Sequence, residues 1–186
     1  MAIEREIKLC FESADEARAK ALALGVTPLR GRRLQEDALL DTDDEQLRRR
    51  RCVLRVRKEG GKSLLTFKGP VQPGLMKLRE EHETVVADGE VLLTMLEQLG
   101  LHVWFRYEKY REEFSADDVV IAIDETPMGT FVELEGGEAA IHEMARALGR
   151  EPADYITDSY RVLFLTYRDA RGRTEQDMVF PVLADA

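Results

Sequence analysis

The sequence has few cysteines, no long apolar run and no excess of positive charge. Its two cysteines, Cys10 and Cys52, show no metal-ligand spacing and have no third or fourth partner, which favours a reduced compartment. No apolar stretch approaches the roughly 20 residues that a membrane-spanning helix needs. Charged residues at positions 4–6 interrupt any apolar run of the signal-peptide kind. We therefore expect a cytoplasmic protein with no membrane partner.

The overall charge is acidic, with 36 Asp and Glu against 27 Lys and Arg and a formal net charge of −9. This balance argues against nucleic acid as the main partner, although a local basic site can lie inside an acidic protein. A length of 186 residues suits a single domain, and no repeat or linker divides residues 1–186. A homodimer is compatible with these features.

The first stretch of residues alternates between charged and apolar side chains. In residues 3–9 the period of two places Glu4, Glu6 and Lys8 on one face of a strand, opposite Ile3 and Ile7. Glu and Lys are poor strand formers, so a face made of them is an unusual choice. One such strand alone indicates only a solvated sheet face.

The same alternation recurs in most of the expected strands. Acids on the charged faces are Glu4, Glu6, Glu81, Glu83, Asp124, Glu133 and Glu135. Bases on the charged faces are Lys8, Arg55, Arg57, Lys68, Arg79, Lys109 and Arg111. A solvated face would carry Thr, Ser and Gln among its charges, because these cost less strand propensity. The almost wholly ionic faces therefore predict that the charges converge on one another.

Helices are expected between these strands. They cover residues from Ser13 to about 24, from about 89 to 98, from about 138 to 148, and from 158 to 167. In the first of them, Ala17, Ala21, Leu22 and Leu24 are predicted to form the buried stripe. Residues from 169 onward are expected to form a short strand or a loose tail.

Three smaller features are interpreted as structural or surface features rather than as parts of a functional site. Residues 59–62, Glu-Gly-Gly-Lys, are predicted to form a hairpin turn. The arginine run 48–51 is interpreted as a solvated surface patch. Tyr107, Tyr110 and Tyr160 are interpreted as packing residues rather than as bases.

The helices can cover the apolar sheet faces, and an antiparallel sheet loses its edges when it closes into a barrel. We therefore predict an α+β fold: a closed antiparallel barrel with a polar, charged interior and helices outside. Two carboxylates about 4 Å apart repel by roughly 4 kcal/mol at an effective dielectric constant near 20. The clustered acids would accordingly take Mg²⁺ or Mn²⁺, and the bases a multiply charged ligand with phosphate oxygens. Ion-paired, partly solvated sheet faces are the alternative that the residues leave open.

A series of motifs, in order along nearly the whole chain, resembles the CYTH family, the triphosphate tunnel metalloenzymes. It begins with Glu4-x-Glu6-x-Lys8, the E-x-E-x-K motif of that family. The later motifs are 54–57, 66–68, Arg79 with Glu81 and Glu83, Lys109-Tyr-Arg111, Asp124, 129–135 and Ser159-Tyr160. The segments 129–135 and 159–160 are most similar to bacterial cyclase-like and thiamine-triphosphatase-like members.

The resemblance implies an eight-stranded tunnel that binds a linear triphosphate and a divalent metal. It implies that metal is held by Glu4, Glu6, Glu133 and Glu135, with Asp124, Glu81 and Glu83 close by. It implies that phosphates are bound by Lys8, Arg55, Arg57, Lys68, Arg79, Lys109 and Arg111. In the catalytic set we place Glu4, Glu6, Glu81 and Lys8, and we add Glu83 and Asp124 to the metal ligands. Leu39 and Leu40 replace an aromatic pair of the family pattern, so the resemblance leaves the organic end of the substrate undefined.

Three functions are compatible with this description. The first is a metal-dependent hydrolase of inorganic, thiamine or nucleoside triphosphate, in which a second metal, or a carboxylate near Glu81 or Glu83, orients the attacking water. The second is a class IV adenylyl cyclase, in which the ribose 3′-hydroxyl replaces water as the nucleophile. The third is a non-catalytic module that binds polyphosphate or phosphorylated RNA ends, for which paired carboxylates are unnecessary.

Overall fold

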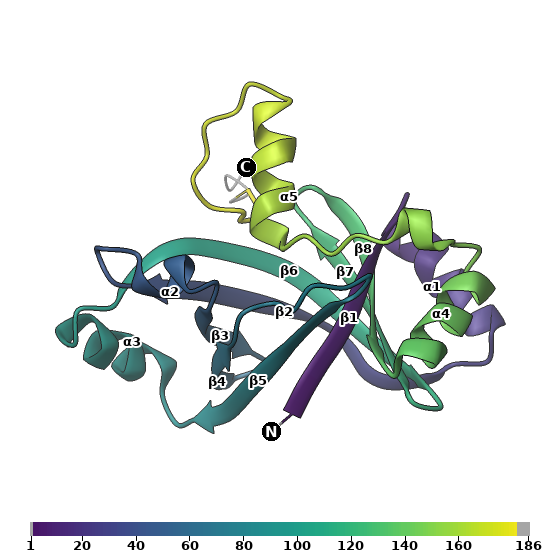
Figure 1. The fold of residues 1–186 in the computed structure, drawn as a ribbon, viewed down its shortest axis with the longest axis horizontal. Helices are drawn as coiled ribbons and strands as arrows, with labels where there is room; N and C mark the ends of the chain where they lie inside the picture. Colours follow the sequence, from purple (N-terminus) through teal and green to yellow (C-terminus); the bar gives the residue numbers. More distant parts are fainter. Residues whose placement is uncertain (1, 182–186) are drawn as a thin grey trace, which may run out of the picture.

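The chain folds around a closed antiparallel β-barrel (Figure 1), seen in a computed structural model that describes residues 2–181. Hydrogen bonds join the strands in the order β1-β5-β4-β3-β2-β6-β7-β8, and β8 pairs with β1 to close the ring. The strands are β1 (Ala2–Phe11), β2 (Thr27–Asp41), β3 (Val53–Glu59), β4 (Lys62–Lys68), β5 (Lys77–Val86), β6 (His102–Ala116), β7 (Val119–Thr126) and β8 (Gly129–Gly136). The predicted α+β class and closed barrel are confirmed.

Helices lie outside the barrel (Figure 1). They are α1 (Ala14–Ala23), α2 (Gln46–Arg49), α3 (Gly89–Gln98), α4 (Glu138–Ala147) and α5 (Tyr160–Asp169), with a 3₁₀ turn at Pro152–Asp154. The last helix begins at Tyr160 because the Ser159 side chain accepts a hydrogen bond from the Val162 amide, so the helix starts two residues later than predicted. The helices expected near 89–98 and 138–148 have nearly the predicted bounds.

The β3–β4 hairpin forms where the sequence predicts it. Glu59 pairs with Lys62, and the two residues between them, Gly60 and Gly61, have φ values of 55° and 77°. Two successive positive φ angles are typical of the tight turn that matches the twist of a two-stranded hairpin, and glycine adopts them without steric cost. Arg55 and Arg57 share a face of β3 by alternation, and the turn fixes the register that places Thr66 and Leu64 opposite them.

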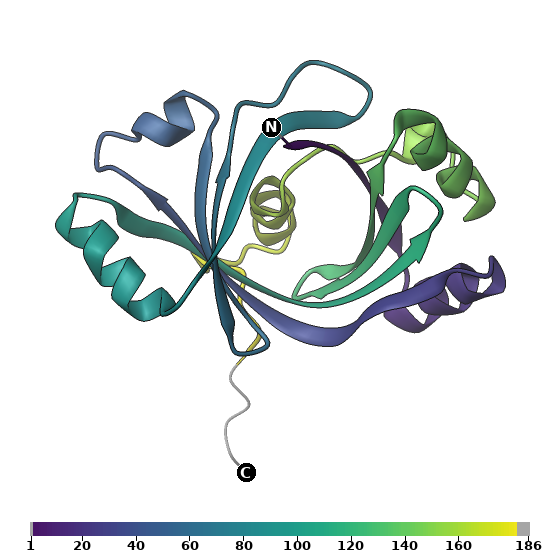
Figure 2. The same cartoon turned by 90° about the horizontal axis from the view of Figure 1, so that it is seen from below.

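The larger apolar core lies between the barrel and the helices α1 and α4, which lie side by side (Figures 1 and 2). Ile7 and Leu9 of β1 face this core, on the side of the strand opposite Glu6 and Lys8. Ala17 and Ala21 of α1 are buried in it, but Leu22 and Leu24 are 48% and 41% exposed. The predicted stripe was thus wrong for the two leucines, since α1 packs through its small residues.

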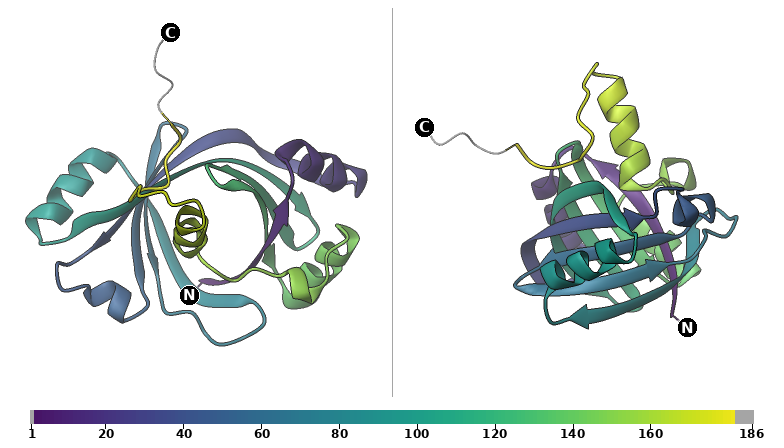
Figure 3. Two further views of the ribbon diagram at one scale, coloured as in Figure 1. Left: turned by 90° about the horizontal axis from the view of Figure 1, so that it is seen from above. Right: turned by 90° about the vertical axis from the view of Figure 1, so that its left-hand side faces the viewer.

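A second apolar cluster joins the barrel to α5, which lies apart from α1 and α4 (Figure 3). Seen from below, α5 appears inside the outline of the ring of strands (Figure 2). The cluster is made of Leu39, Phe105, Phe131, Tyr160, Phe164 and Met178. Met178 hydrogen-bonds with β6 at Arg106 and Glu108, in a parallel bridge beside Tyr107. The segment after α5 therefore adds a short strand-like stretch, one of the two predicted outcomes; residues 182–186 lie outside the described part.

No helix in the described range 2–181 is both long enough and apolar enough to cross a membrane.

Candidate functional site

The charged strand faces point into one cavity inside the barrel, with a volume of about 920 Å³. Side chains alternate along each strand. Because the apolar side chains point outward into the core beneath the helices, the charged side chains point into the barrel. Every residue of the predicted site except Asp124 lines this cavity. The predicted convergence of the ionic faces is therefore observed, and the charges also form ion pairs with one another.

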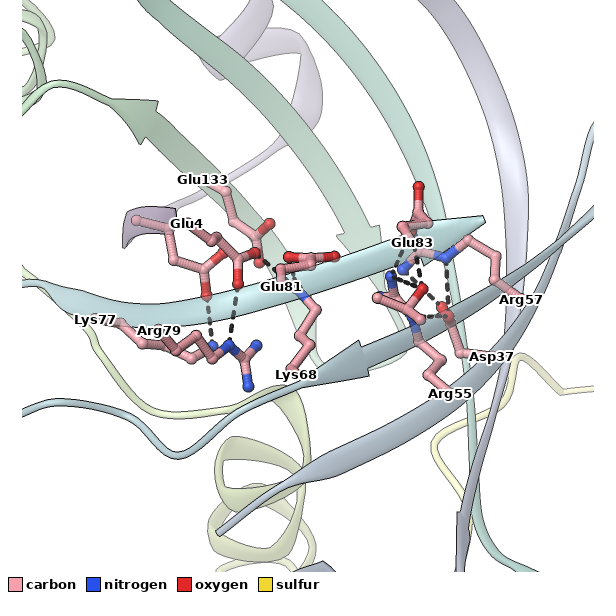
Figure 4. Close-up of polar contacts among 12 residues, drawn as sticks. Glu4, Asp37, Arg55, Arg57, Lys68, Lys77, Arg79, Glu81, Glu83 and Glu133 are labelled. Atoms are coloured by element: carbon pink, nitrogen blue, oxygen red, sulfur yellow. Dashed lines mark hydrogen bonds and ion pairs between the residues drawn. The ribbon is translucent and has the colours of Figure 1, made fainter. Parts of the chain in front are cut away.

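Five carboxylates on three neighbouring strands form what we call the acidic wall. They are Glu4 and Glu6 of β1, Glu81 of β5, and Glu133 and Glu135 of β8. Four bases of this region separate the carboxylates, namely Lys8, Lys68, Lys77 and Arg79. Figure 4 shows Lys68, Lys77 and Arg79 reaching the acids from β4 and β5.

Glu4 and Glu6 are each held by two cations. Glu4 accepts from Lys68 at 2.7 Å and from the Arg79 Nε at 3.0 Å. Glu6 accepts from Lys77 at 2.5 Å and from Lys8 at 3.2 Å. Burial opposes ionisation of Glu6, but the positive charges of Lys8 and Lys77 outweigh burial and hold its pKa far below the usual value. The Glu6 carboxylate is therefore charged at neutral pH.

Glu135 has a different electrostatic environment. It remains accessible to solvent along the cavity wall, but the surrounding walls limit its hydration and raise its pKa to about 7. The negative charges of Glu4 and Glu6 add to this shift. The negative charge at Glu4, Glu6 and Glu135 is thus not fully neutralised by the neighbouring bases.

On the opposite side of the ring, four bases form what we call the basic wall. They are Arg55 and Arg57 of β3, and Lys109 and Arg111 of β6. Strand β2 lies between β3 and β6, whereas β4 and β7 separate these strands from the acidic wall. The two walls therefore face one another across the cavity.

Asp37 of β2 is the acid that holds the two arginines of β3 (Figure 4). The Arg57 guanidinium donates to both Asp37 oxygens, at 2.8 and 3.1 Å. The Arg55 Nε lies 3.4 Å from Asp37 but forms no hydrogen bond. One buried carboxylate thus serves two guanidiniums, which leaves donor capacity directed into the cavity.

Arg55 also meets the strands on its other side. Its Nη2 donates to the Thr66 hydroxyl at 3.1 Å and lies 3.4 Å from the Glu83 carboxylate. Glu83 also accepts from Thr66 at 2.8 Å, and its side chain is 40% exposed. Among the predicted metal ligands, Glu83 therefore lies beside the basic wall rather than with the carboxylates of β1 and β8.

Asp124 of β7 lies within the barrel wall beneath Lys109 and Arg111. It accepts from the Lys109 Nζ at 2.7 Å, the Arg111 Nε at 2.7 Å and the Tyr160 hydroxyl at 2.6 Å. It is fully buried and does not line the cavity, unlike the other predicted metal ligands. Its contacts position the bases above it.

The positive charge of Lys109 is only partly compensated by the neighbouring acids. Burial and the neighbouring Arg111 lower its pKa to about 8, even though Asp124 favours its charged form. Its Nζ lies 4.8 Å from the centre of the Tyr160 ring, a cation–π distance. Lys109 is the counterpart of Glu135: each has more charge of its own sign nearby than the protein neutralises.

Glu133 connects the two walls. Its carboxylate pairs with Lys8 of β1 at 3.2 Å and with Arg111 of β6, which only β7 separates from β8. Burial disfavours its charge, but Lys8 and Arg111 reverse the effect and lower its pKa well below the usual value. A ligand that separated these pairs would free acids on one side and bases on the other.

Sequence reasoning missed three site residues. Asp37 lies in a segment that was compared with the family only for its missing aromatic pair, although its position two residues before Leu39 places it on the inner face. Lys77 shares a face with Arg79, and this signal was available but unused. Tyr160 was interpreted as a packing residue; it does pack against Phe131, but its hydroxyl also contacts Asp124.

The carboxylates fit a hard divalent cation by their chemistry, since Mg²⁺ and Mn²⁺ prefer oxygen ligands. The raised pKa of Glu135 indicates uncompensated negative charge next to Glu4 and Glu6. In the described residues, no three His, Cys, Asp or Glu side chains are already arranged around one point as metal ligands. Metal binding would therefore require some of the ion pairs with Lys68 and Lys77 to open.

The CYTH domain family model matches residues 2–160. A protein of Methanocaldococcus jannaschii, MJ0240, which is named as a candidate adenylate cyclase, is 30% identical over 147 residues. That alignment covers 78% of this chain and 83% of the archaeal protein.

Solved structures share the fold. The PH1819 protein of Pyrococcus horikoshii is 26% identical, with a TM-score of 0.75 over 89% of this chain and 99% of its own. HpAC1 of Hippeastrum, a candidate adenylyl cyclase described as having a dominant triphosphatase activity, is 18% identical with a TM-score of 0.65. That match covers 94% of this chain and 98% of the Hippeastrum protein, and at this identity it concerns the fold alone.

Proposed function

The chain belongs to the CYTH domain family, and from this premise we propose that it is a divalent-metal-dependent hydrolase of a triphosphate substrate. The observation that carries the proposal is that the acidic wall and the basic wall face one another across a single cavity. A triphosphate is a short chain of anionic groups, which basic side chains bind along its length. The uncompensated carboxylates on the other side suit a cation that contacts the same phosphates.

The bases would bind the phosphate oxygens and stabilise the charge that develops on the leaving phosphate. Arg57 is already held in place by a bidentate pair with Asp37, so it needs little reorganisation to bind phosphate. Lys109 and Arg111 are positioned in the same way by Asp124. The remaining phosphate-binding bases in the proposal are Lys8, Arg55, Lys68 and Arg79.

Glu4, Glu6, Glu133 and Glu135 would hold the metal, whereas Glu83 lies beside Arg55 of the basic wall and is not part of this set. When bound, Mg²⁺ or Mn²⁺ supplies Lewis-acid polarisation of phosphate oxygens. Opening of the Glu4 and Glu6 ion pairs would release Lys68, Lys77 and Arg79 toward the phosphates. In this proposal the carboxylates and bases thus exchange their present partners for the two ligands.

Glu81 is the candidate for orienting the attacking water. Burial acts against its charge, but Lys68 at 2.7 Å lowers its pKa, so the carboxylate is ionised and can accept a hydrogen bond from water. The water oxygen would form a bond to the terminal phosphorus as the bond to the bridging oxygen breaks. The leaving diphosphate takes the electron pair, and the proton of water passes to Glu81 or to solvent.

Adenylyl cyclisation is the second candidate, because the archaeal relative at 30% identity is named for it. The same walls would hold the phosphates of ATP, while the ribose 3′-hydroxyl, in place of water, would form a bond to the α-phosphorus as the bond to the bridging oxygen breaks and pyrophosphate leaves with the electron pair. The fold hosts a dominant triphosphatase activity in the Hippeastrum protein, so the name of a relative does not decide between the two outcomes.

A substrate panel tests this proposal. The purified chain is incubated with tripolyphosphate, thiamine triphosphate and ATP, each with Mg²⁺ or Mn²⁺, and phosphate, pyrophosphate and cyclic AMP are quantified. We expect phosphate release that EDTA abolishes and that Glu133→Gln lowers by at least about a hundredfold. Glu97→Gln, at an exposed carboxylate of α3, is the matched control and should leave the rate unchanged.

Two outcomes contradict the hydrolase proposal. Cyclic AMP as the main product from ATP would establish the cyclase instead. Absence of turnover, together with tripolyphosphate binding that Glu133→Gln preserves or strengthens, would establish a binding module. A thermal melt of Glu133→Gln separates loss of chemistry from loss of folding.

A further inference from the structure

The cavity changes character toward α5. On β2, β3 and β6 the inward positions are ionic or polar at Asp37, Arg55 and Tyr107, and they become apolar two residues further along. The apolar positions that line the cavity are Leu39, Val53 and Phe105. Two residues along a strand correspond to about 7 Å. An apolar section therefore follows directly after the phosphate-binding bases.

A β-bulge directs Trp104 into this section. Leu39 pairs with Phe105, but the next residue of β2, Leu40, pairs with Val103, so Trp104 is an extra residue on β6. A bulge of this kind re-aims a side chain. The rings of Trp104 and Phe105 consequently lie on the same side of the strand, with centres 6.0 Å apart, and both residues line the cavity.

Two guanidiniums stack on Trp104, from elements far apart in the sequence. The Arg48 Cζ lies 4.3 Å from the ring centre and the Arg161 Cζ lies 4.7 Å from it. Arg48 is fixed by the buried Asp41 at 3.1 Å, so the arginine run at 48–51 is not only a solvated patch. Together these residues form what we call the arginine–tryptophan mouth: Arg48, Trp104 and Arg161.

Arg161, like Arg51, differs from the ion-paired arginines that line the cavity. Within residues 2–181 its guanidinium forms no ion pair within 4.0 Å and no hydrogen bond, whereas Arg48 pairs with Asp41 and Glu45. Partial burial and the charges of Arg48 and Arg168 lower its pKa, and Glu45 opposes this only in part. Besides Arg48, Arg51 and the exposed Asp158 are the charged groups that line this end of the cavity. A free guanidinium face thus lies beside apolar side chains in a setting of excess positive charge.

We propose that the arginine–tryptophan mouth binds the organic end of the triphosphate substrate as a flat, neutral aromatic group of the nucleobase class and excludes a cationic group. Guanidinium planes stack on nucleobases, and the adjacent Leu39, Val53 and Phe105 supply apolar contact. A cavity of about 920 Å³ is near the upper end of the range of about 300–1,000 Å³ typical of sites for organic ligands. This inference rests on the proposed function, because it assigns the substrate class of the same site.

Charge distinguishes the possible organic groups. The thiazolium ring of thiamine carries a permanent positive charge, which Arg161 and Arg51 would repel. A nucleobase is neutral and gains the stacking contact without that repulsion. Tripolyphosphate has no organic group, so it should be insensitive to the contacts of the mouth, apart from a small long-range attraction.

Calorimetric binding in EDTA tests the inference separately from turnover. The probes are ATP, thiamine triphosphate and tripolyphosphate, and the variants are Arg161→Gln and Arg161→Glu. For the wild-type chain we expect ATP to bind at least about tenfold more tightly than thiamine triphosphate, the size of one partly screened charge interaction. Arg161→Glu should reduce that ratio by about tenfold, Arg161→Gln should fall between, and tripolyphosphate affinity should change least.

Arg171→Glu makes the same change of charge near the far end of α5, where Arg171 is exposed and stacks on Tyr167. This control should leave the ratio unchanged. Equal wild-type affinities for ATP and thiamine triphosphate, or an equal loss for all three probes in Arg161→Glu, would overturn the inference. If the ratio behaves as expected but no probe is turned over with metal, the proposed hydrolase fails while the specificity of the mouth stands.

Discussion

The acidic wall and the basic wall are built from the same local pattern but have opposite electrostatic states. Each uses alternating charged residues on adjacent strands, and each contains buried pairs of acid and base. On β1 and β8 the surplus is negative, and burial together with the charges of Glu4 and Glu6 raises the pKa of Glu135 to about 7. On β6 the surplus is positive, and burial together with the charge of Arg111 lowers the pKa of Lys109 to about 8. The tunnel thus offers a place for a cation beside a place for an anion.

This difference shows why neither wall resembles an ordinary ion-paired core. Burying a charge costs several kcal/mol unless its partner and hydrogen bonds compensate for the lost hydration. An arrangement selected only for stability would match acids and bases one to one. Here Asp37 serves Arg55 and Arg57, while Glu135 is left among other acids. These two charge imbalances lie on opposite walls. A cation bound at the acidic wall and an anion bound at the basic wall would compensate them.

The largest effect is expected on anion affinity when one charge is removed from each wall in turn. Arg57→Gln should weaken tripolyphosphate binding in EDTA by roughly 10- to 100-fold, because a charge-assisted bidentate donor is lost. Glu4→Gln should preserve or strengthen binding, because a competing anion is removed from Lys68 and Arg79. Isothermal titration calorimetry measures both.

A control is needed because Arg57→Gln leaves Asp37 buried with weaker compensation. The double variant Asp37→Asn/Arg57→Gln removes both charges and should recover thermal stability without recovering affinity. Equal weakening by Glu4→Gln and Arg57→Gln would show that the two walls do not divide the binding of anions and cations.

The pH dependence should separate the walls with an intermediate effect. A lysine is cationic below its pKa, so tripolyphosphate affinity in EDTA should fall as pH rises above about 8, where Lys109 loses its charge. A carboxylate is anionic above its pKa, so Mn²⁺ affinity should rise as pH increases through about 7, where Glu135 ionises. Each slope should be at most about tenfold per pH unit for one proton.

Titrations from pH 6 to 9.5 measure the two affinities independently. Lys109→Arg should extend the range of strong anion binding to higher pH, because a guanidinium stays charged. Glu135→Gln should remove the rise in Mn²⁺ affinity near pH 7. A common pH profile for both ligands would contradict separate titrating groups.

The smallest effect is expected for the hydrogen bond that links α5 to the basic wall. Tyr160→Phe keeps the ring but removes the hydroxyl that donates to Asp124 at 2.6 Å. We expect the free energy of unfolding to fall by about 1–2 kcal/mol, as for a buried hydrogen bond to a charged acceptor. Urea denaturation measures this loss.

Tyr110→Phe is the matched control, because no hydrogen bond of the Tyr110 hydroxyl is found within residues 2–181, although its ring packs at a tilted angle against Phe180. Its unfolding free energy should stay within about 0.5 kcal/mol of the wild type. A loss in Tyr110→Phe as large as in Tyr160→Phe would attribute the effect to general packing rather than to the contact with Asp124.

Much of the site could be predicted from alternation alone. The period of two assigned Glu4, Glu6 and Lys8 to one face without reference to any partner strand, and the apolar opposite face indicated which side is buried. The same rule could have included Asp37 and Lys77, which share the inner faces of β2 and β5. Trp104 could not be found in this way, because a bulge breaks the alternation at that point.

The sequence by itself determined which residues alternate, where most helices occur and that the ionic faces had to meet, because these are local properties of strand and helix geometry. Only the tertiary structure decided which acid pairs with which base, since Glu133 and Arg111, or Asp37 and Arg57, meet through strand order and register. It also decided that Asp124 lies beneath the cavity surface and that Arg48 and Arg161 share one indole ring. Those contacts depend on closure of the barrel and on the packing of α5, which no stretch of sequence specifies alone.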